Sequence, residues 1–275
     1  MKPFSVLMSV YRNDNPAFFR KAVESISVRQ TLKPSEILII VDGPVPDHLM
    51  NEIQRLREEI SEIRVIFLEK NGGLGNALRI GMEKVSHEIV ARMDSDDISA
   101  PDRFEKQLKY LEEHPECDIV GGQITEFIDN ESNIVGKREV PCLNDEIVMW
   151  LRGRCPLNHM TVTMLRSRGL EAGNYIDWHF NEDYYLWIRM FENGCRFANL
   201  PDTLVNVRVG KEMYSRRGGW KYFKSEKGLQ DYMLQKGIIG WGRYCFNVAV
   251  RFGVQVMMPN SVRGFVFKTL FRKKS

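Results

Sequence analysis

Continuous apolar runs alternate with amphipathic stretches over residues 4–122, and this alternation limits the chain to a small set of folds. The runs are apolar at consecutive positions rather than at every second one, which is typical of strands covered on both faces of a parallel sheet. Five segments fit this description: residues 4–10, 36–41, 64–68, 88–93 and 118–122. The stretches between them have the apolar spacing of helices, at residues 15–29, 46–60, 75–85 and 104–113.

The pattern predicts an α/β fold with a mixed, mostly parallel sheet flanked by helices. The rhythm changes after residue 122, where turn residues at Asp129-Asn130 and Val135-Gly136 predict short antiparallel strands. Residues 181–193 then have the pattern of an amphipathic helix. We expect a first domain over residues 1–206 and a basic helical appendage over residues 207–275.

Charge is distributed unevenly along the chain. Its 275 residues carry a net charge of +3, but residues 207–275 alone hold 15 Lys and Arg against 3 Asp and Glu. Aromatic residues such as Trp220 and Trp241 are interleaved with the basic ones. This combination is typical of a helix on an anionic membrane surface. The alternative is a solvated basic face over a packed core, and nucleic acid is not the expected partner.

Cysteine and hydropathy patterns indicate the compartment. The five cysteines are widely spaced and odd in number, which favours free thiols in a reducing compartment over disulfides or a metal site. No secretory signal precedes the first strand, and no apolar run reaches the roughly 18 to 20 residues of a transmembrane helix. We therefore expect a cytoplasmic protein that is peripheral on the inner face of the cell membrane.

The run at 88–93 ends in a cluster of carboxylates. Asp94 and Asp96 are two residues apart, so in an extended segment they point to the same side. Their repulsion would be relieved by a divalent cation bound through oxygen, with positions left open for a phosphate. The alternative is helix capping, but a cap needs one such residue, and Ser99 before Pro101 is the more natural cap. The cluster therefore predicts a metal–diphosphate site at the carboxyl end of a strand.

Two other strand ends carry residues suited to a nucleotide. Ser9 lies near the end of the first strand, Tyr11 follows that strand, and Asp42 follows the second. In a doubly wound sheet these ends share one edge with Asp94. Tyr11 could line a base pocket and Asp42 could accept a hydrogen bond from a base N–H. For Asp42 the alternative is a plain turn, because Asp42-Gly43-Pro44 is strong turn chemistry.

A glycine-rich turn at Asn71-Gly72-Gly73-Leu74-Gly75 joins the third strand to a helix. Its glycines would let backbone amides approach a ligand. No Lys-Ser or Lys-Thr pair follows, so it is not a phosphate-binding Walker loop, and its position and spacing differ from the dinucleotide fingerprint. Taken alone, this segment is best interpreted as a structural turn.

Three further segments contain candidate functional side chains. Glu182-Asp183 opens a helix, where carboxylates are favoured by the helix dipole; a carboxylate there could also serve as a general base for a hydroxyl acceptor. His159 is isolated, and an isolated histidine is more often structural. Arg216-Arg217 lies in a glycine-containing stretch that could close over a diphosphate or remain an exposed loop.

Taken in order, these positions resemble the family 2 glycosyltransferases, which have the GT-A (Rossmann-like) fold. The resemblance covers roughly residues 4–210. It rests on Ser9-Val10-Tyr11, Val41-Asp42-Gly43, Asn71-Gly72-Gly73-Leu74, Ala91-Arg92-Met93-Asp94-Ser95-Asp96-Asp97 with Pro101-Asp102-Arg103, Gly121-Gly122, His159 and Glu182-Asp183. The ordered set is specific, although no single member is.

The resemblance implies inverting transfer of a sugar from a nucleotide-activated donor, usually a UDP-sugar. It implies that Asp42 and Tyr11 hold the base, that Asp94 contacts ribose and sugar, and that Asp96 is the main ligand of Mn²⁺ or Mg²⁺. Asp183 is then the expected catalytic base, with Glu182 beside it. The other positions expected on the donor side are Ser9, Asn71, Gly73, Arg92, Ser95, His159, Arg216 and Arg217.

One departure from the family bears on the type of reaction. Processive members carry Gln-x-x-Arg-Trp and transmembrane helices, whereas here Trp220 follows Arg216-Arg217-Gly218-Gly219. The resemblance therefore favours addition of one glucose, galactose or N-acetylhexosamine. The basic tail suits an acceptor on undecaprenyl diphosphate, as in bacterial surface polysaccharide (O-antigen or capsule) synthesis.

Two alternatives remain at this stage. A sugar-nucleotide nucleotidyltransferase would share the sheet and the carboxylate pair, but its glycine-rich loop is replaced here by Tyr11-Arg12-Asn13-Asp14-Asn15. A non-catalytic membrane-surface binding module would not need an intact Asp94, Asp96 and Asp183.

Overall fold

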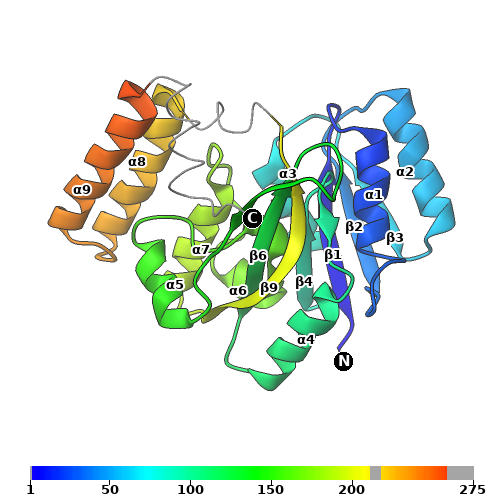
Figure 1. Cartoon of the computed structure of the whole chain (residues 1–275), viewed down its shortest axis with the longest axis horizontal. Helices are drawn as coiled ribbons and strands as arrows, with labels where there is room; N and C mark the ends of the chain where they lie inside the picture. Colours follow the sequence, from blue (N-terminus) through cyan, green and yellow to red (C-terminus); the bar gives the residue numbers. More distant parts are fainter. Residues whose placement is uncertain (1, 211–217, 259–275) are drawn as a thin grey trace.

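One mixed sheet organises the protein (Figure 1). The structure is a computed structural model that describes residues 2–210 and 218–258. Within these residues the sheet has nine strands in the order β3-β2-β1-β4-β8-β6-β9-β5, with β7 paired to β6. The strands are β1 (Phe4–Val10), β2 (Glu36–Val41), β3 (Ile63–Phe67), β4 (Ile89–Met93), β5 (Ile98–Ser99), β6 (Ile119–Phe127), β7 (Ile134–Arg138), β8 (Thr163–Leu165) and β9 (Phe197–Arg208).

Helices cover both faces of the sheet. The helices are α1 (Pro16–Ser25), α2 (Asp47–Glu59), α3 (Leu74–Lys84), α4 (Arg103–Glu113), α5 (Asn144–Leu151), α6 (Arg166–Glu171), α7 (Glu182–Glu192), α8 (Trp220–Gln235) and α9 (Trp241–Phe252), with short turns η1 (His159–Thr161) and η2 (Gly253–Met257). Helices α1, α2 and α4 pack in the core on one face. Helices α3, α5, α7 and α8 contribute to the core on the other.

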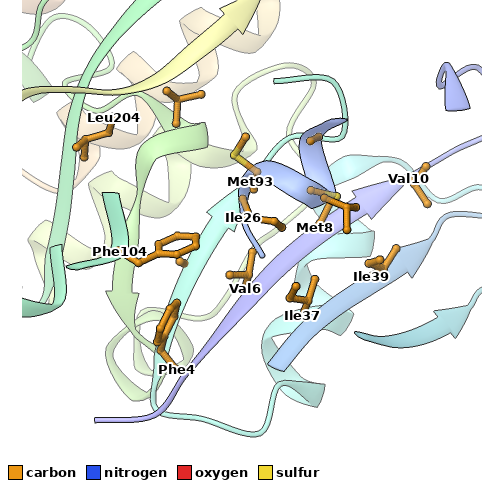
Figure 2. Close-up of a cluster of buried hydrophobic side chains, with 14 of the residues drawn as sticks. Phe4, Val6, Met8, Val10, Ile26, Ile37, Ile39, Met93, Phe104 and Leu204 are labelled. Carbon is orange, nitrogen blue, oxygen red and sulfur yellow. The ribbon is translucent and has the colours of Figure 1, made fainter. Parts of the chain in front are cut away.

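The expected parallel arrangement is confirmed for the first four long strands. β1 pairs in parallel with β2 and β4, and β2 pairs in parallel with β3. Side chains alternate between the two cores, since Val6 and Met8 enter one and Leu7 the other. Figure 2 shows Val6, Met8 and Ile39 gathered on the first of these faces. Because the four strands run the same way, the residues that follow them meet at one edge.

Two sequence-based expectations are wrong in detail. Val135 and Gly136 do not form a turn; they lie inside β7, which forms one hairpin with β6 around Asp129. Ser99 does not cap α4, because it lies in β5, where its amide donates to Ser25 Oγ at 3.0 Å. The helix instead begins after Asp102, whose side chain pairs with Lys106 at 2.7 Å.

A buried polar network fixes β4, the strand that leads to the carboxylate cluster. Arg103 is fully buried, and its Nη2 donates to the backbone oxygen of Arg92 at 2.8 Å while its Nε donates to Gln107 at 3.0 Å. Gln107 in turn donates to the backbone oxygens of Val120 and Thr161. Since buried polar groups are costly unless bonded, this network fixes α4, β4 and β6 in one register.

The C-terminal helices pack against the domain. Leu229 and Met233 of α8 are buried in the same core as Trp187 of α7, and α9 lies on the outer side of α8 (Figure 1). Strand β9, which the sequence analysis did not predict, runs to Arg208 and so ends just beyond residue 206. In the part of the chain that the structure describes, no helix is both long and apolar enough to cross a membrane.

Gly43 permits a close approach between the end of β2 and the glycine-rich turn. Its φ is +83°, and an added Cβ would lie 2.4 Å from the backbone nitrogen of Asn71. Gly194 also has a positive φ, +74°, but an added Cβ there would meet nothing within 4 Å. Substitution of Gly194 therefore carries only the conformational penalty of a positive φ, whereas substitution of Gly43 adds a steric clash.

We expect Gly194→Ala to lower the free energy of unfolding by about 1–2 kcal/mol, the penalty of a left-handed alanine. Gly43→Ala should lower it by at least about 2 kcal/mol more, because backbone atoms must also move. Urea denaturation of both variants measures this difference. Equal losses would contradict a tight contact at Gly43.

Candidate active site

Asp42 ties the end of β2 to the glycine-rich turn. Its Oδ1 accepts from the amide of Gly72 at 2.8 Å and its Oδ2 from that of Gly73 at 2.9 Å. Asn71 Nδ2 donates back to the Asp42 backbone oxygen at 3.1 Å. Asp42 is buried, but each carboxylate oxygen can accept a second bond. The structure thus brings Asp42, Asn71 and Gly73 together and orders the turn that opens α3.

Arg92 is a buried cation beneath the carboxylate cluster. Its side chain is 3% exposed and forms an ion pair with Asp94. Burial raises the pKa values of Asp97, Glu182 and Asp183, and the positive charge of Arg92 opposes this by favouring their ionised forms. Within the described residues, Arg92 Nε and Nη1 have no hydrogen-bond partner. Both nitrogens are shielded from solvent, so the charge of Arg92 acts on the site chiefly through its pairing with Asp94.

Asp96 and Asp97 differ in environment. Asp97 is buried and accepts from the amide of Arg208 at 2.8 Å, so it ties the end of β4 to β9. Asp96 is exposed at the rim, while Arg208 Nε donates to its backbone oxygen at 3.2 Å. Although Asp96 is exposed on its outer side, the protein atoms packed around its carboxylate, followed by repulsion from Asp94 and Asp14, raise its pKa to about 6.

Asp14 is a fourth carboxylate in this cluster, and the sequence analysis missed it. It comes from the loop after β1, where its Oδ2 accepts from the amide of Tyr11 at 3.0 Å and from Ser95 Oγ at 2.9 Å. Burial raises its pKa to about 6, with a further contribution from Asp94. This position has the sequence signature of a turn residue, so the sequence alone offers no signal that it joins the β4 edge.

The donor set at this edge fits a divalent cation. Asp94 and Asp96 offer hard oxygen ligands, and their mutual repulsion would fall on binding a positive charge. In the part of the chain that the structure describes, no group of three or more His, Cys, Asp or Glu could hold a metal ion by itself.

The start of α7 places a second pair of carboxylates at the site. Burial, followed by repulsion from Asp183, raises the pKa of Glu182 to about 7. Burial also raises the pKa of Asp183, whereas the amide of Tyr184 and the charge of Arg92 lower it. The thiol of Cys155 donates to Asp183 Oδ2 at 3.7 Å. A carboxylate that is orientated and made more basic in this way can accept a proton.

The glycine-rich turn and α7 are in direct contact. An added Cβ at Gly75 would lie 3.2 Å from the Cβ of Glu182 and 3.5 Å from the backbone oxygen of Ile176. Any side chain at Gly75 would therefore crowd the start of α7. This contact places the α7 carboxylates beside the turn that Asp42 holds.

His159 belongs to a buried aromatic cluster beside Arg92. Its Nε2 is hydrogen-bonded to the hydroxyl of Tyr175 at 2.9 Å, and its ring lies 5.9 Å from that of Trp187. Burial, and then the charge of Arg92, lower the pKa of His159 well below its usual value, so the ring is neutral. The observed contacts of His159 are thus with Tyr175 and Trp187.

The remaining predicted residues differ in burial and in their contacts. Ser9 is half-buried near the end of β1, and Tyr11 is 38% exposed in the loop that holds Asp14. Ser95 is buried and bonded to Asp14. Arg216 and Arg217 lie outside the residues that the structure describes.

Sequence reasoning also missed Arg208 and Cys155. The guanidinium of Arg208 lies over the ring of Phe18, 3.8 Å from its centroid, and its charge lowers the pKa of Asp96. Neither residue belongs to a recognisable motif, since they lie far along the chain from the groups they contact. Only the folded chain brings Arg208 to Asp96 and Cys155 to Asp183.

The raised pKa of Asp14 makes a prediction about stability. The carboxylate binds protons more tightly when folded, with a pKa of about 6, than at its ordinary value of 3.8. Its stabilising effect is therefore complete below pH 3.8 and is lost as the pH rises through 6. We expect Asp14→Asn to raise the free energy of unfolding at pH 8 by about 1–2 kcal/mol, allowing for solvent screening.

This gain should shrink steadily towards pH 4, which urea denaturation in chelator-treated buffer at several pH values would measure. Glu58→Gln, on the exposed face of α2, is the matched control for loss of one carboxylate. A gain that does not depend on pH would contradict the electrostatic explanation.

Two relatives match this chain over nearly its whole length. The amylovoran biosynthesis glycosyltransferase AmsE of Erwinia amylovora is 37% identical over 265 residues, covering 96% of this chain and 98% of the relative. The UDP-Gal:alpha-D-GlcNAc-diphosphoundecaprenol beta-1,3-galactosyltransferase of Escherichia coli is 35% identical over 270 residues, covering 98% and 97%.

Solved structures share the fold at low sequence identity. TarS 1–349 of S. aureus in complex with UDP-GlcNAc matches with a TM-score of 0.66 at 16% identity, covering 98% of this chain and 76% of that fragment. This chain spans 46% of the longer TarS structure. The mannosyltransferase PcManGT of Pyrobaculum calidifontis, in complex with GDP-Man and Mn²⁺, matches at 13% identity with a TM-score of 0.63, covering 96% and 74%.

The expected GT-A fold is therefore confirmed, and the family can be stated. The family described as Glycosyl transferase family 2 matches residues 5–173, which include the Asp42, Asp94 and Asp96 positions. By this match and by its relatives, the chain belongs to glycosyl transferase family 2.

Proposed function

We propose that this protein is an inverting glycosyltransferase that moves one sugar from a UDP-sugar to a saccharide on a lipid diphosphate. The observation that carries the proposal is the convergence of two carboxylate groups on Arg92. Asp94 comes from the end of β4 and Asp183 from the start of α7, and both interact with the same buried cation. A donor-binding edge and a proton acceptor thus share one site.

Each residue has a role that follows from its place. Tyr11 and Asp42 hold the uracil and order the adjoining turn, and Asp94 orientates the ribose and sugar against Arg92. Asp96, with Asp94, would hold Mn²⁺ or Mg²⁺, which when bound neutralises charge that develops on the departing UDP diphosphate. Ser95 and Asp14 keep the cluster in place. We assign the helices that follow residue 206 to the acceptor side.

Asp183 acts as the general base. It accepts the proton of the acceptor hydroxyl as that oxygen attacks the anomeric carbon, on the face opposite the departing UDP. One such displacement inverts the anomeric configuration. The pKa of Asp183 is raised by burial, which makes it a better proton acceptor than an exposed aspartate. Glu182 lies beside Asp183, and burial, followed by repulsion between the two carboxylates, raises the pKa of Glu182.

The relatives support the donor and acceptor classes. The E. coli relative acts with UDP-Gal on GlcNAc-diphosphoundecaprenol, and the E. amylovora relative acts in amylovoran biosynthesis. Both align over at least 96% of this chain, including α8 and α9. We therefore assign UDP-glucose, UDP-galactose or a UDP-N-acetylhexosamine as donor. The acceptor is a saccharide on undecaprenyl diphosphate at the inner membrane face, for surface polysaccharide such as O-antigen.

A donor screen tests the proposal. UDP-glucose, UDP-galactose, UDP-GlcNAc and UDP-GalNAc are each incubated with Mn²⁺, with and without a synthetic GlcNAc-diphospholipid, and released UDP is measured. We expect one donor to release UDP, with stimulation by the acceptor and loss on chelation. Asp96→Asn should weaken the metal dependence, whereas Asp202→Asn, a half-buried carboxylate on β9 that pairs with Lys106, should leave it unchanged.

Release of pyrophosphate from a nucleoside triphosphate and a sugar phosphate would contradict the proposal and indicate nucleotidyl transfer. Binding of UDP without turnover of any donor would indicate a binding module instead.

A further inference from the structure

Helix α9 exposes its apolar side chains. Trp241 is 71% exposed and Phe246 is 66% exposed. On a helix, the exposed residues of α9 fall largely on one side. The exposed residues of α9 are Trp241, Gly242, Arg243, Cys245, Phe246, Ala249 and Val250. Arg243 is the one charged residue among them and lies at the edge of this outer face, beside Val250, so the rest of the face is an apolar stripe.

The inner side of the same helix combines polar contacts with the packing of Phe252, whose ring centroid lies 5.5 Å from that of Phe223 on α8. Asn247, its one buried residue, donates to the backbone oxygen of Arg152 at 2.9 Å and to Gln230 Oε1 at 2.8 Å. Arg251 pairs with Glu226 at 2.6 Å, and its Nη2 donates to the backbone oxygen of Gly153 at 2.8 Å. Polar contacts therefore attach α9 to α8 and to the end of α5.

This arrangement differs from that of an ordinary surface helix. A helix on a water-soluble domain packs its apolar stripe inward and leaves polar groups in water. Here hydrogen bonds, an ion pair and the ring of Phe252 hold the inner face, while Trp241, Phe246 and Val250 face outward. Exposed apolar patches of this kind mark contact with another apolar phase or partner. Interfacial helices bury such a face in the headgroup region of a bilayer.

The charges around the stripe favour a lipid surface. Lys221, Lys224 and Arg243 are exposed on α8 and α9. The two acidic residues of these helices are engaged internally, Glu226 with Arg251 and Asp231 with Lys227. A basic rim around an apolar face attracts anionic lipid, whereas two copies of the same face would bring like charges together. Tryptophan is also the side chain most suited to the membrane interface.

We propose that the outer face of α9 is a membrane-docking surface, with Trp241, Phe246 and Val250 inserted among the acyl chains of an anionic monolayer. This inference deepens the proposed function by naming how the enzyme meets a lipid-borne acceptor, and it rests on that function only for the identity of the acceptor. The docking itself depends on the apolar face of α9 and on the basic rim that α8 and α9 share.

Contacts connect this surface to the active site. Trp178 Nε1 donates to the backbone oxygen of Ser225 on α8 at 3.0 Å, and Asn181 Nδ2 donates to Ser225 Oγ at 3.1 Å. Asn181 directly precedes the Glu182 and Asp183 pair at the start of α7. Docking through α9 would therefore hold the catalytic base at a fixed position relative to the bilayer.

Vesicle binding of the purified full-length protein tests the proposal. The vesicles contain phosphatidylethanolamine and phosphatidylglycerol in a ratio of about 3:1, and neutral phosphatidylcholine vesicles serve for comparison. We expect the Trp241→Ser/Phe246→Ser double variant to bind the anionic vesicles at least about tenfold more weakly than the unaltered protein. The Val28→Ser/Leu143→Ser variant is the matched control, because it also removes two exposed apolar side chains, 58% and 67% exposed. Circular dichroism melting should be similar for all three proteins.

Equal vesicle binding by the double variant and the control would overturn the proposal. So would a dimer in solution that becomes monomeric on the double substitution while vesicle binding is unchanged, since the face would then meet a second copy. The vesicle assay contains no sugar donor. Binding that depends on Trp241 and Phe246 would therefore support membrane docking even if the protein turned over no donor. Failure of the docking inference is thus distinguishable from failure of the proposed function.

Discussion

The buried guanidinium of Arg92 is the interaction on which the site depends. It lies at the end of a central strand, paired with Asp94 and within electrostatic reach of Asp97, Glu182 and Asp183. Four carboxylates in a partly buried space would repel strongly without a cation, and a buried ion pair that loses one partner leaves an uncompensated charge. Arg103 holds the backbone of Arg92 in place from α4. Both halves of the site thus use the charge of Arg92, while Arg208 also lowers the pKa of Asp96 and Arg138 that of Asp183.

One cation does not neutralise the whole cluster. Burial first, and repulsion between crowded carboxylates second, raise the pKa values of Asp14 and Asp96 to about 6 and that of Glu182 to about 7. Such crowding lowers stability and is typical of functional sites. It also gives a divalent cation and its diphosphate a physical reason to bind at this edge. In the proposed mechanism, the carboxylates after β4 bind the donor and Asp183 at the start of α7 accepts the proton.

The sequence predicted the features that depend on local pattern. Runs of apolar residues identified β1 to β4, and two aspartates after β4 identified the carboxylate edge. It did not predict β9, whose interior contains Pro201 and Asp202 and whose pairing with β6 shifts register near Gly122. Asp14 and Cys155 could not be predicted because the chain brings them to the site only on folding. The polarity of α9 was missed for a related reason: composition shows aromatics and basic residues, but which face turns inward depends on the partners of Asn247 and Arg251.

The assignment of Asp183 as the base is tested most directly by separating binding from turnover. Calorimetry of UDP with Mn²⁺ and the rate of sugar transfer would be measured for the unaltered protein, Asp183→Asn and Glu182→Gln. The account predicts that Asp183→Asn keeps its UDP affinity within about twofold and loses about 10²- to 10⁴-fold in transfer, with a smaller loss for Glu182→Gln. Transfer by Asp183→Asn at the unaltered rate, or a loss of UDP affinity equal to the loss of transfer, would contradict it.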